Sequence, residues 1–92
     1  MKKLSIIVPC YNEEAVLAES YRRTKEVLKQ LTCPTEIIYV NDGSRDATRS
    51  ILDAISVSDP TVKVIHFSRN FGLLPAVTAG IHHCDADLAV IL

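Results

Sequence analysis

Short apolar runs rich in β-branched residues alternate along this chain with segments of helical periodicity, and this alternation restricts the fold more than any other feature. Between the runs, apolar side chains recur every three or four positions, which predicts amphipathic helices beginning near Glu13, Asp46 and Pro75. The order strand, helix, strand, helix, strand, helix, strand is typical of βαβ units. We therefore predict an α/β fold with a Rossmann-like parallel sheet and helices on both faces. The expected strands are residues 4–8, 36–40, 62–67 and 88–92.

Right-handed crossovers favour the spatial strand order 3-2-1-4, with the reversal between the first and fourth strands. The third run, residues 62–67, alternates in polarity and is expected near an edge of the sheet. Asn12 stands where the first helix needs an N-cap, and it is predicted to fill that role. Ligands of such sheets bind beyond the carboxyl ends of the strands, so functional residues are sought in the loops that follow them.

Composition narrows the class of protein. With 92 residues and a formal net charge of −1, the chain can form one modest core and carries no basic surface for nucleic acid. Cys10, Cys33 and Cys84 are odd in number and widely spaced, which fits buried or half-buried thiols in a reducing compartment better than a disulfide framework or a zinc ribbon. The first apolar run stops at Pro9, too early for a signal peptide, so we expect a cytosolic N-terminus.

The chain ends inside an apolar run, without a turn or a polar tail after Leu92. A complete domain rarely stops in this way, because the last strand would lack a partner. Residues 1–92 are therefore interpreted as the N-terminal nucleotide-binding part of a single, incomplete domain. The free edge of the fourth strand could pair with a second copy and give a homodimer.

Three polar loops follow the first three predicted strands: residues 9–14, 41–46 and 68–72. The first loop contains no glycine, which argues against both a dinucleotide fingerprint and a P-loop. It offers instead the ring of Tyr11, which can stack on a base, and amide and carboxylate groups that can accept hydrogen bonds from a nucleoside. Asp42 adds an acceptor and Arg69 a cation. Since carboxylates repel phosphate, a divalent cation is expected to neutralise the phosphates.

Three motifs in register, IVPCYNEE at 7–14, VNDGSRDAT at 40–48 and SRNFG at 68–72, resemble those of family-2 glycosyltransferases. The third motif is most similar to that of polyprenyl-phosphate sugar transferases. The resemblance implies transfer of a sugar from a UDP- or GDP-sugar to a polyprenyl phosphate at the cytosolic face of a membrane, with Mg²⁺ or Mn²⁺. It also implies a nucleotide site of seven residues: Pro9, Tyr11, Asn12, Glu13, Asn41, Asp42 and Arg69.

Two positions depart from the family pattern. Asn41 stands where the family usually has the first aspartate of Asp-Asp-Gly-Ser, so either Asn41 or Asp42 could contact the base. Leu73 and Leu74 stand where the family often has a polar or charged residue, which weakens an assignment of acceptor contacts to the third loop.

The metal-binding Asp-x-Asp of the family is expected after Leu92, so no metal ligand or catalytic residue is assigned within the chain, and the isolated chain is expected to be inactive. Asp85-Ala86-Asp87 precedes the fourth strand and would lie at its amino end, roughly 15 Å from the site at about 3.3 Å per residue. The neighbouring residues 82–85 also contain potential ligands, but adjacent side chains at a helix end point in different directions and cannot converge on one ion.

A plainer interpretation of the loops is available. Asn12 and Glu13 could merely stabilise a helix start, and Asp42-Gly43 could be only a turn. A different class of function, a receiver- or flavodoxin-like module without catalysis, also shares this order of elements. Receiver domains place acids after the first and third strands and a lysine on a later strand, which this sequence lacks. The nucleotide-binding interpretation is favoured because the polar residues should meet at one edge of the sheet.

Overall fold

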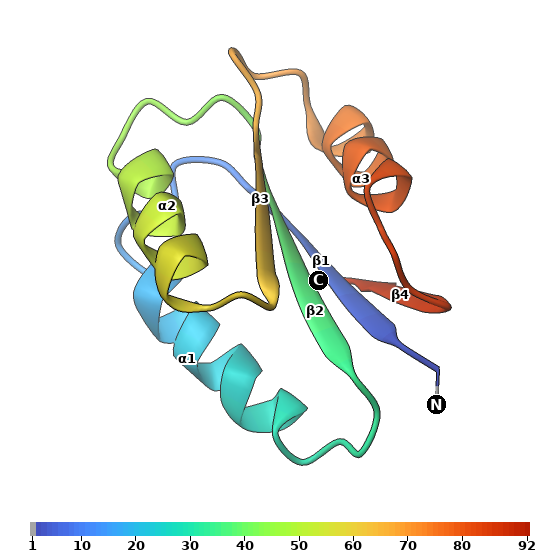
Figure 1. Cartoon of the computed structure of the whole chain (residues 1–92). Helices are drawn as coiled ribbons and strands as arrows, with labels where there is room; N and C mark the ends of the chain where they lie inside the picture. The colour runs from blue at the N-terminus through green and yellow to red at the C-terminus, as the bar shows by residue number, and fades with distance from the viewer. Residues whose placement is uncertain (1) are drawn as a thin grey trace.

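A computed structural model describes residues 2–92. Strands and helices alternate throughout, as the sequence predicts (Figure 1). The strand boundaries lie within three residues of those expected, and β1 and β2 extend further than expected at their carboxyl ends. The elements are β1 (Leu4–Cys10), α1 (Leu17–Leu28), β2 (Thr35–Asn41), α2 (Thr48–Ser58), β3 (Val62–His66), α3 (Leu73–His82) and β4 (Leu88–Ile91).

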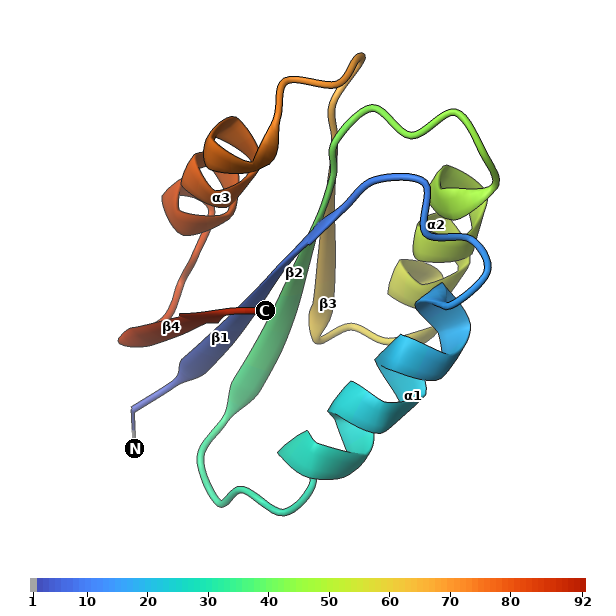
Figure 2. The ribbon, with the colours of Figure 1, turned by 180° about the vertical axis from the view of Figure 1, so that it is seen from behind.

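The four strands form one parallel sheet in the order β3-β2-β1-β4, which confirms the predicted topology. The register pairs Ile7 with Ile38 on one side and with Ile91 on the other. β3 is an edge strand, as predicted, and β4 forms the other edge of the sheet within residues 2–92. Helices α1 and α2 cover one face and α3 covers the opposite face (Figures 1 and 2).

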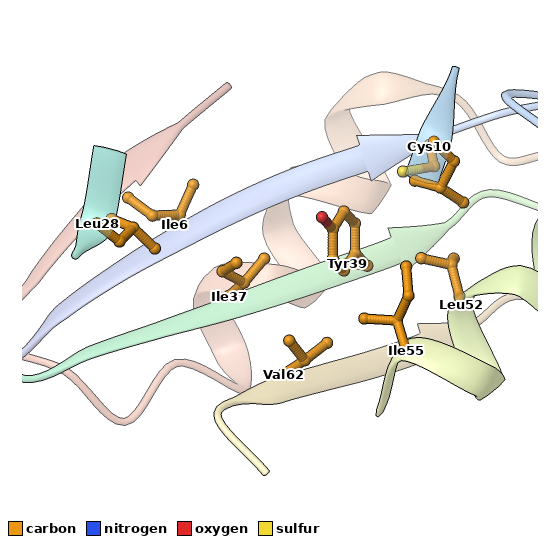
Figure 3. Close-up of a cluster of buried hydrophobic side chains, with 9 residues drawn as sticks. Ile6, Cys10, Leu28, Ile37, Tyr39, Leu52, Ile55 and Val62 are labelled. Atoms are coloured by element: carbon orange, nitrogen blue, oxygen red, sulfur yellow. The ribbon is translucent and has the colours of Figure 1, made fainter. Parts of the chain in front are cut away.

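Alternate residues of the central strands supply two separate cores, which explains why these strands are apolar on both faces. Ile37 and Tyr39 point toward α1 and α2, where they pack with Leu52 of α2 in the larger cluster shown in Figure 3. Ile38 and Val40 point the other way and pack with Ala76 of α3. Five of these six residues have no exposed surface, and the sixth, Tyr39, is 1% exposed.

The predicted start of the first helix is wrong. α1 begins at Leu17 instead of near Glu13, and Asn12 is not its N-cap. Asn12 has a φ of 51°, in the left-handed region, and its side chain accepts a hydrogen bond from the backbone of Arg45 in another loop. Contacts with the second loop therefore shape the segment before α1. Local sequence signals for helix capping give no information about such contacts.

Pro9 lies within β1, a position that a proline can occupy only where no strand needs its missing amide hydrogen. Ile7, two residues earlier, directs its carbonyl toward β4 and accepts a hydrogen bond from Leu92. Pro9 faces the same side, and the described pairing of β1 with β4 ends at Ile7. β1 can thus carry Pro9, a residue of the predicted site, without losing a ladder hydrogen bond within the described chain.

The amino end of the sheet holds a charged network, remote from the predicted site. The carboxylate of Glu36, 3% exposed, forms ion pairs with Lys3 at 3.3 Å and Lys63 at 3.0 Å, and it accepts hydrogen bonds from the Ser5 hydroxyl and the Asp85 amide. This network ties β1, β2 and β3 to the turn before β4. Among residues 2–92, no helix is both long and apolar enough to span a bilayer.

Candidate functional site

The loops that follow β1, β2 and β3 leave the sheet at the same end, uppermost in Figures 1 and 2. Because β1 and β2 extend further than predicted and β3 ends earlier, the loops have slightly different bounds from those predicted. From here on, the first loop is residues 11–16, the second loop is residues 42–47 and the third loop is residues 67–72. They follow the carboxyl ends of neighbouring parallel strands, and hydrogen bonds join them to one another. The residues predicted for a nucleotide site are therefore brought to one edge of the sheet.

Backbone amides of the first loop donate to side chains of the second loop and of the α2 start. The Asn12 amide donates to the Ser44 hydroxyl at 2.9 Å, and the Arg45 amide donates to the Asn12 side chain at 2.8 Å. The Glu13 amide donates to the Thr48 hydroxyl at 2.9 Å. Because the first loop contributes only its backbone amides and the side-chain oxygen of Asn12 to these bonds, they hold the loop in place and leave the ring of Tyr11 outside the network.

Asp46 completes this junction. Its carboxylate accepts from the Thr48 amide at 2.9 Å and from the Glu14 amide at 3.2 Å. Hydrogen bonding by Thr48 outweighs desolvation and lowers the pKa of Asp46 from its ordinary value. The helix predicted from Asp46 begins at Thr48, and Asp46 satisfies an amide in its first turn.

The second and third loops are joined through Asp42, whose side chain is 5% exposed. Its carboxylate accepts hydrogen bonds from the Phe71 amide at 2.8 Å, from the Gly72 amide at 3.0 Å and from the Asn70 side chain at 3.0 Å. A carboxylate offers about four acceptor directions, so three are used inside the protein. The sequence predicts that Asp42 contacts a base, and the structure adds a role in shaping the third loop.

Gly43 permits the second and third loops to touch. Its φ is 70°, which favours glycine, and a Cβ built there would lie 2.1 Å from the carbonyl carbon of Arg69 and 2.4 Å from the amide nitrogen of Asn70. No side chain fits in that space. The turn expected at Asp42-Gly43 is therefore also the place where two loops pack backbone against backbone.

Asn41, the other candidate for a base contact, lies at the end of β2 and is 2% exposed. Its side-chain oxygen accepts from the Ser44 amide at 3.1 Å, and its side-chain nitrogen contacts Nδ1 of His66 at 3.0 Å. Nε2 of His66 lies 2.7 Å from the Asp53 carboxylate. Sequence reasoning missed His66 and Asp53; the signal for His66 was its position at the carboxyl end of a strand.

The third loop presents a cation and an aromatic ring at the rim. The Arg69 guanidinium lies 4.7 Å from the centroid of the Phe71 ring. The Phe71 and Phe67 rings are nearly perpendicular, with 5.5 Å between their centroids. Phe71 is 47% exposed, and Arg69 is exposed as well. A cation over an aromatic face is held without losing its charge, so Arg69 can face a phosphate or another anion.

Tyr11, Asn12 and Arg69 are thus the exposed members of the predicted site, with Tyr11 at 45% exposure. Pro9 and Glu13 are half-buried at the base of the first loop. Cys10 lies between them and is buried, and burial together with the nearby charge of Glu13 raises the pKa of its thiol to about 12. Cys10 is therefore a protonated core residue and not a nucleophile.

Potential metal ligands are present in the described residues, but they are not brought together. Within residues 2–92, no three histidine, cysteine, aspartate or glutamate side chains are grouped to hold an ion. The Asp87 carboxylate accepts from the Lys3 amide at 2.9 Å, and Lys3 Nζ lies 3.9 Å from the Asp85 carboxylate. Both aspartates lie at the amino end of β4, at the opposite end of the sheet from the three loops, as the sequence predicts.

The sequence that contains these loops matches one protein family. The sequence profile described as "Glycosyl transferase family 2" matches residues 5–92. The chain belongs to glycosyl transferase family 2. The resemblance seen in the three motifs is thereby confirmed, and the receiver-like alternative is set aside. Because the match begins within β1 and runs to the last residue of the chain, it includes all three loops.

Individual relatives agree with the family. The chain is 48% identical over 88 residues to "Uncharacterized glycosyltransferase YkcC" of Bacillus subtilis, covering 96% of this chain and 27% of that protein. It is 42% identical over 88 residues to "Bactoprenol glucosyl transferase" of Shigella phage SfV, covering 96% of this chain and 29% of that protein. The chain therefore spans less than a third of the length of these curated relatives.

A solved structure has the same fold. The mannosyltransferase PcManGT from Pyrobaculum calidifontis, determined in complex with GDP-Man and Mn²⁺, superposes with a TM-score of 0.82 over 96% of this chain and 26% of its own, at 20% identity. At that identity the similarity confirms the α/β architecture and the strand order. It does not by itself assign a ligand to this chain.

Proposed function

We propose that the whole protein that carries this chain transfers a sugar from a nucleoside diphosphate sugar to a polyprenyl phosphate, and that residues 9–72 bind the nucleoside. The observation that carries this proposal is the joining of three polar loops into one rim, with Tyr11 and Arg69 exposed on it. Membership of glycosyl transferase family 2 supports the reaction class, and the bactoprenol transferase relative supports the acceptor.

The rim suits a nucleoside better than phosphate alone. Tyr11 provides a ring on which a base can stack, while Arg69 is held over Phe71 where an anion could approach it. Stacking of one base on an aromatic side chain contributes roughly 1–3 kcal/mol. Binding of the diphosphate needs further cationic charge, which we assign to a divalent cation whose ligands lie outside residues 2–92.

The acceptor assignment places the reaction at a membrane. A polyprenyl chain stays in the bilayer, so the transferase domain would work at the cytosolic face, where nucleotide sugars are available to it. Pairing of the β4 edges of two copies is a separate prediction. Sedimentation of this chain at high concentration tests it, and a monomer alone would contradict it.

Nucleotide titration tests the proposal. UDP and GDP, each with Mn²⁺, are titrated into the ¹⁵N-labelled chain, and amide shifts are followed. We expect shifts in the three loops and none at the amino end of the sheet around Glu36. Absence of any shift with both nucleotides at millimolar concentration, or shifts centred on the amino end, would contradict the proposed site.

Site variants connect binding with specific groups. Tyr11→Ala is expected to weaken nucleotide binding by the 1–3 kcal/mol of a lost stack, whereas Tyr11→Phe keeps the ring and should bind as the wild type does. Arg69→Ala removes a charge and is expected to cost roughly 1.5–3 kcal/mol. Arg49→Ala, an exposed arginine on α2, is the matched control and should leave binding unchanged. Transfer of radiolabelled sugar to a polyprenyl phosphate by the whole protein completes the test.

A further inference from the structure

The amide of Asn41 can adopt only one orientation in this structure. The Ser44 amide nitrogen, 3.1 Å away, is a donor, so the side-chain oxygen of Asn41 must face it. The side-chain nitrogen then faces Nδ1 of His66 at 3.0 Å. Asn41 is 2% exposed, which leaves water little opportunity to replace either partner.

This orientation determines the state of His66. Because the Asn41 nitrogen donates, Nδ1 of His66 must accept and cannot carry a hydrogen. The hydrogen therefore lies on Nε2, which donates to the Asp53 carboxylate at 2.7 Å. The His66 side chain is 15% exposed. Asp53 of α2, His66 of β3 and Asn41 of β2 thus form one hydrogen-bonded chain, and each of its contacts pairs a donor with an acceptor.

The chain of bonds continues into the nucleotide rim. Ser44, whose amide donates to Asn41, belongs to the second loop. The Ser44 hydroxyl accepts a hydrogen bond from the Asn12 amide of the first loop at 2.9 Å. We propose that His66, oriented by Asp53, is a positioning residue that fixes the Asn41 amide and through it the turn at residues 41–44. The link to nucleotide binding rests on the proposed function.

The inference explains why asparagine suits position 41 in this chain. An aspartate there would present only acceptors, so Nδ1 of His66 would need a hydrogen to face it. Nε2 would still face the Asp53 carboxylate, and both nitrogens of the ring would have to be protonated to satisfy both neighbours. Asn41 and the neutral Nε2–H form of His66 are thus matched to each other.

Two substitutions separate the bonds of His66. His66→Asn can place its amide oxygen near the position of Nδ1 and keep the bond from Asn41. His66→Gln reaches toward Asp53 instead and loses the acceptor next to Asn41. A lost hydrogen bond of ordinary strength corresponds to a factor of about three to ten. In the whole protein, we expect UDP or GDP with Mn²⁺ to bind His66→Gln about three- to tenfold more weakly, and His66→Asn within about twofold of wild type.

The positioning role has its own spectroscopic readouts. Long-range ¹H–¹⁵N correlations should show His66 as the Nε2–H tautomer, and the Ser44 amide should exchange with solvent about three- to tenfold faster in His66→Gln than in wild type. Asn41→Asp should convert His66 to the doubly protonated form. His82→Gln, an exposed histidine on α3, is the control and should change none of these quantities.

The outcomes distinguish the two proposals. Nucleotide binding by His66→Gln at the wild-type affinity, or an Nδ1–H tautomer in the wild-type protein, overturns the inference and leaves the proposed function standing. If the wild-type protein binds neither nucleotide, the proposed function fails. Exchange at the Ser44 amide then decides the inference, and an unchanged rate in His66→Gln overturns it.

Discussion

Asp42→Asn is the sharpest test of how the site is built, because it alters the hydrogen bonding of one buried group with almost no change of shape. In the wild-type protein, one carboxylate oxygen accepts from the Phe71 amide, and the other accepts from the Gly72 amide and the Asn70 side chain. An asparagine can keep only one acceptor oxygen. Its new NH₂ group must face at least one of these donors.

The magnitude follows from this geometry. The less costly orientation keeps the oxygen toward Gly72 and Asn70 and turns the NH₂ group toward Phe71. One hydrogen bond to a charged acceptor is then lost, which costs roughly 1.5–3 kcal/mol, and the two that remain become neutral bonds of about 1 kcal/mol each. We expect the free energy of unfolding to fall by at least about 2.5 kcal/mol, with the disturbance concentrated in the third loop.

Urea unfolding followed by circular dichroism measures the total, and amide hydrogen exchange at Phe71 and Gly72 locates it. Asp85→Asn is the control, because that carboxylate is exposed and its nearest cation is 3.9 Å away. We expect the control to change stability by less than about 0.5 kcal/mol. If Asp42→Asn unfolds like the wild type and the Phe71 and Gly72 amides keep their exchange rates, Asp42 does not hold the third loop.

Three further predictions test other contacts. Gly43→Ala should weaken nucleotide binding at least about tenfold in a titration, because its Cβ would lie 2.1 Å from the Arg69 backbone; Gly72→Ala, with a positive φ but open space, should change it less. Gly80→Ala should cost about 1–3 kcal/mol in urea unfolding, since its Cβ would meet Ile7 at 2.5 Å. Desolvation raises the pKa of Glu36, but bonds from Ser5 and its other partners outweigh this and lower it to about 2. Stability should therefore be intact above pH 4.5 and fall toward pH 2 in thermal unfolding, and Glu36→Gln should flatten that acid dependence.

Much of the fold could be predicted because its signals are local. Runs such as 36–40 are apolar on both faces, and this pattern occurs where a strand is covered on both sides, as Ile37 and Ile38 are. Together with helical periodicity and the right-handed crossover rule, it leads to the strand order that the structure shows. The rule that parallel strands end at one edge also places the three polar loops together before any coordinates are known.

The roles of individual site residues depended on partners that the sequence does not indicate. Asn12 is of a residue type that often caps helices, yet its side chain accepts a hydrogen bond from a loop some thirty residues away. Asp42 is of a residue type that often accepts hydrogen bonds from a ligand, yet it is buried and holds the third loop. In each case the local preference is worth about 1 kcal/mol, and several tertiary hydrogen bonds together exceed it.

The amino-acid sequence by itself therefore determined the α/β class, the topology and the edge of the sheet where the three polar loops meet, because periodicity and strand direction act within or between neighbouring elements. Only the tertiary structure decided which polar side chains face solvent and which hold the loops together. It also brought His66 and Asp53 into contact with Asn41, since hydrogen-bond partners are chosen by the packing of β2, β3 and α2 against one another.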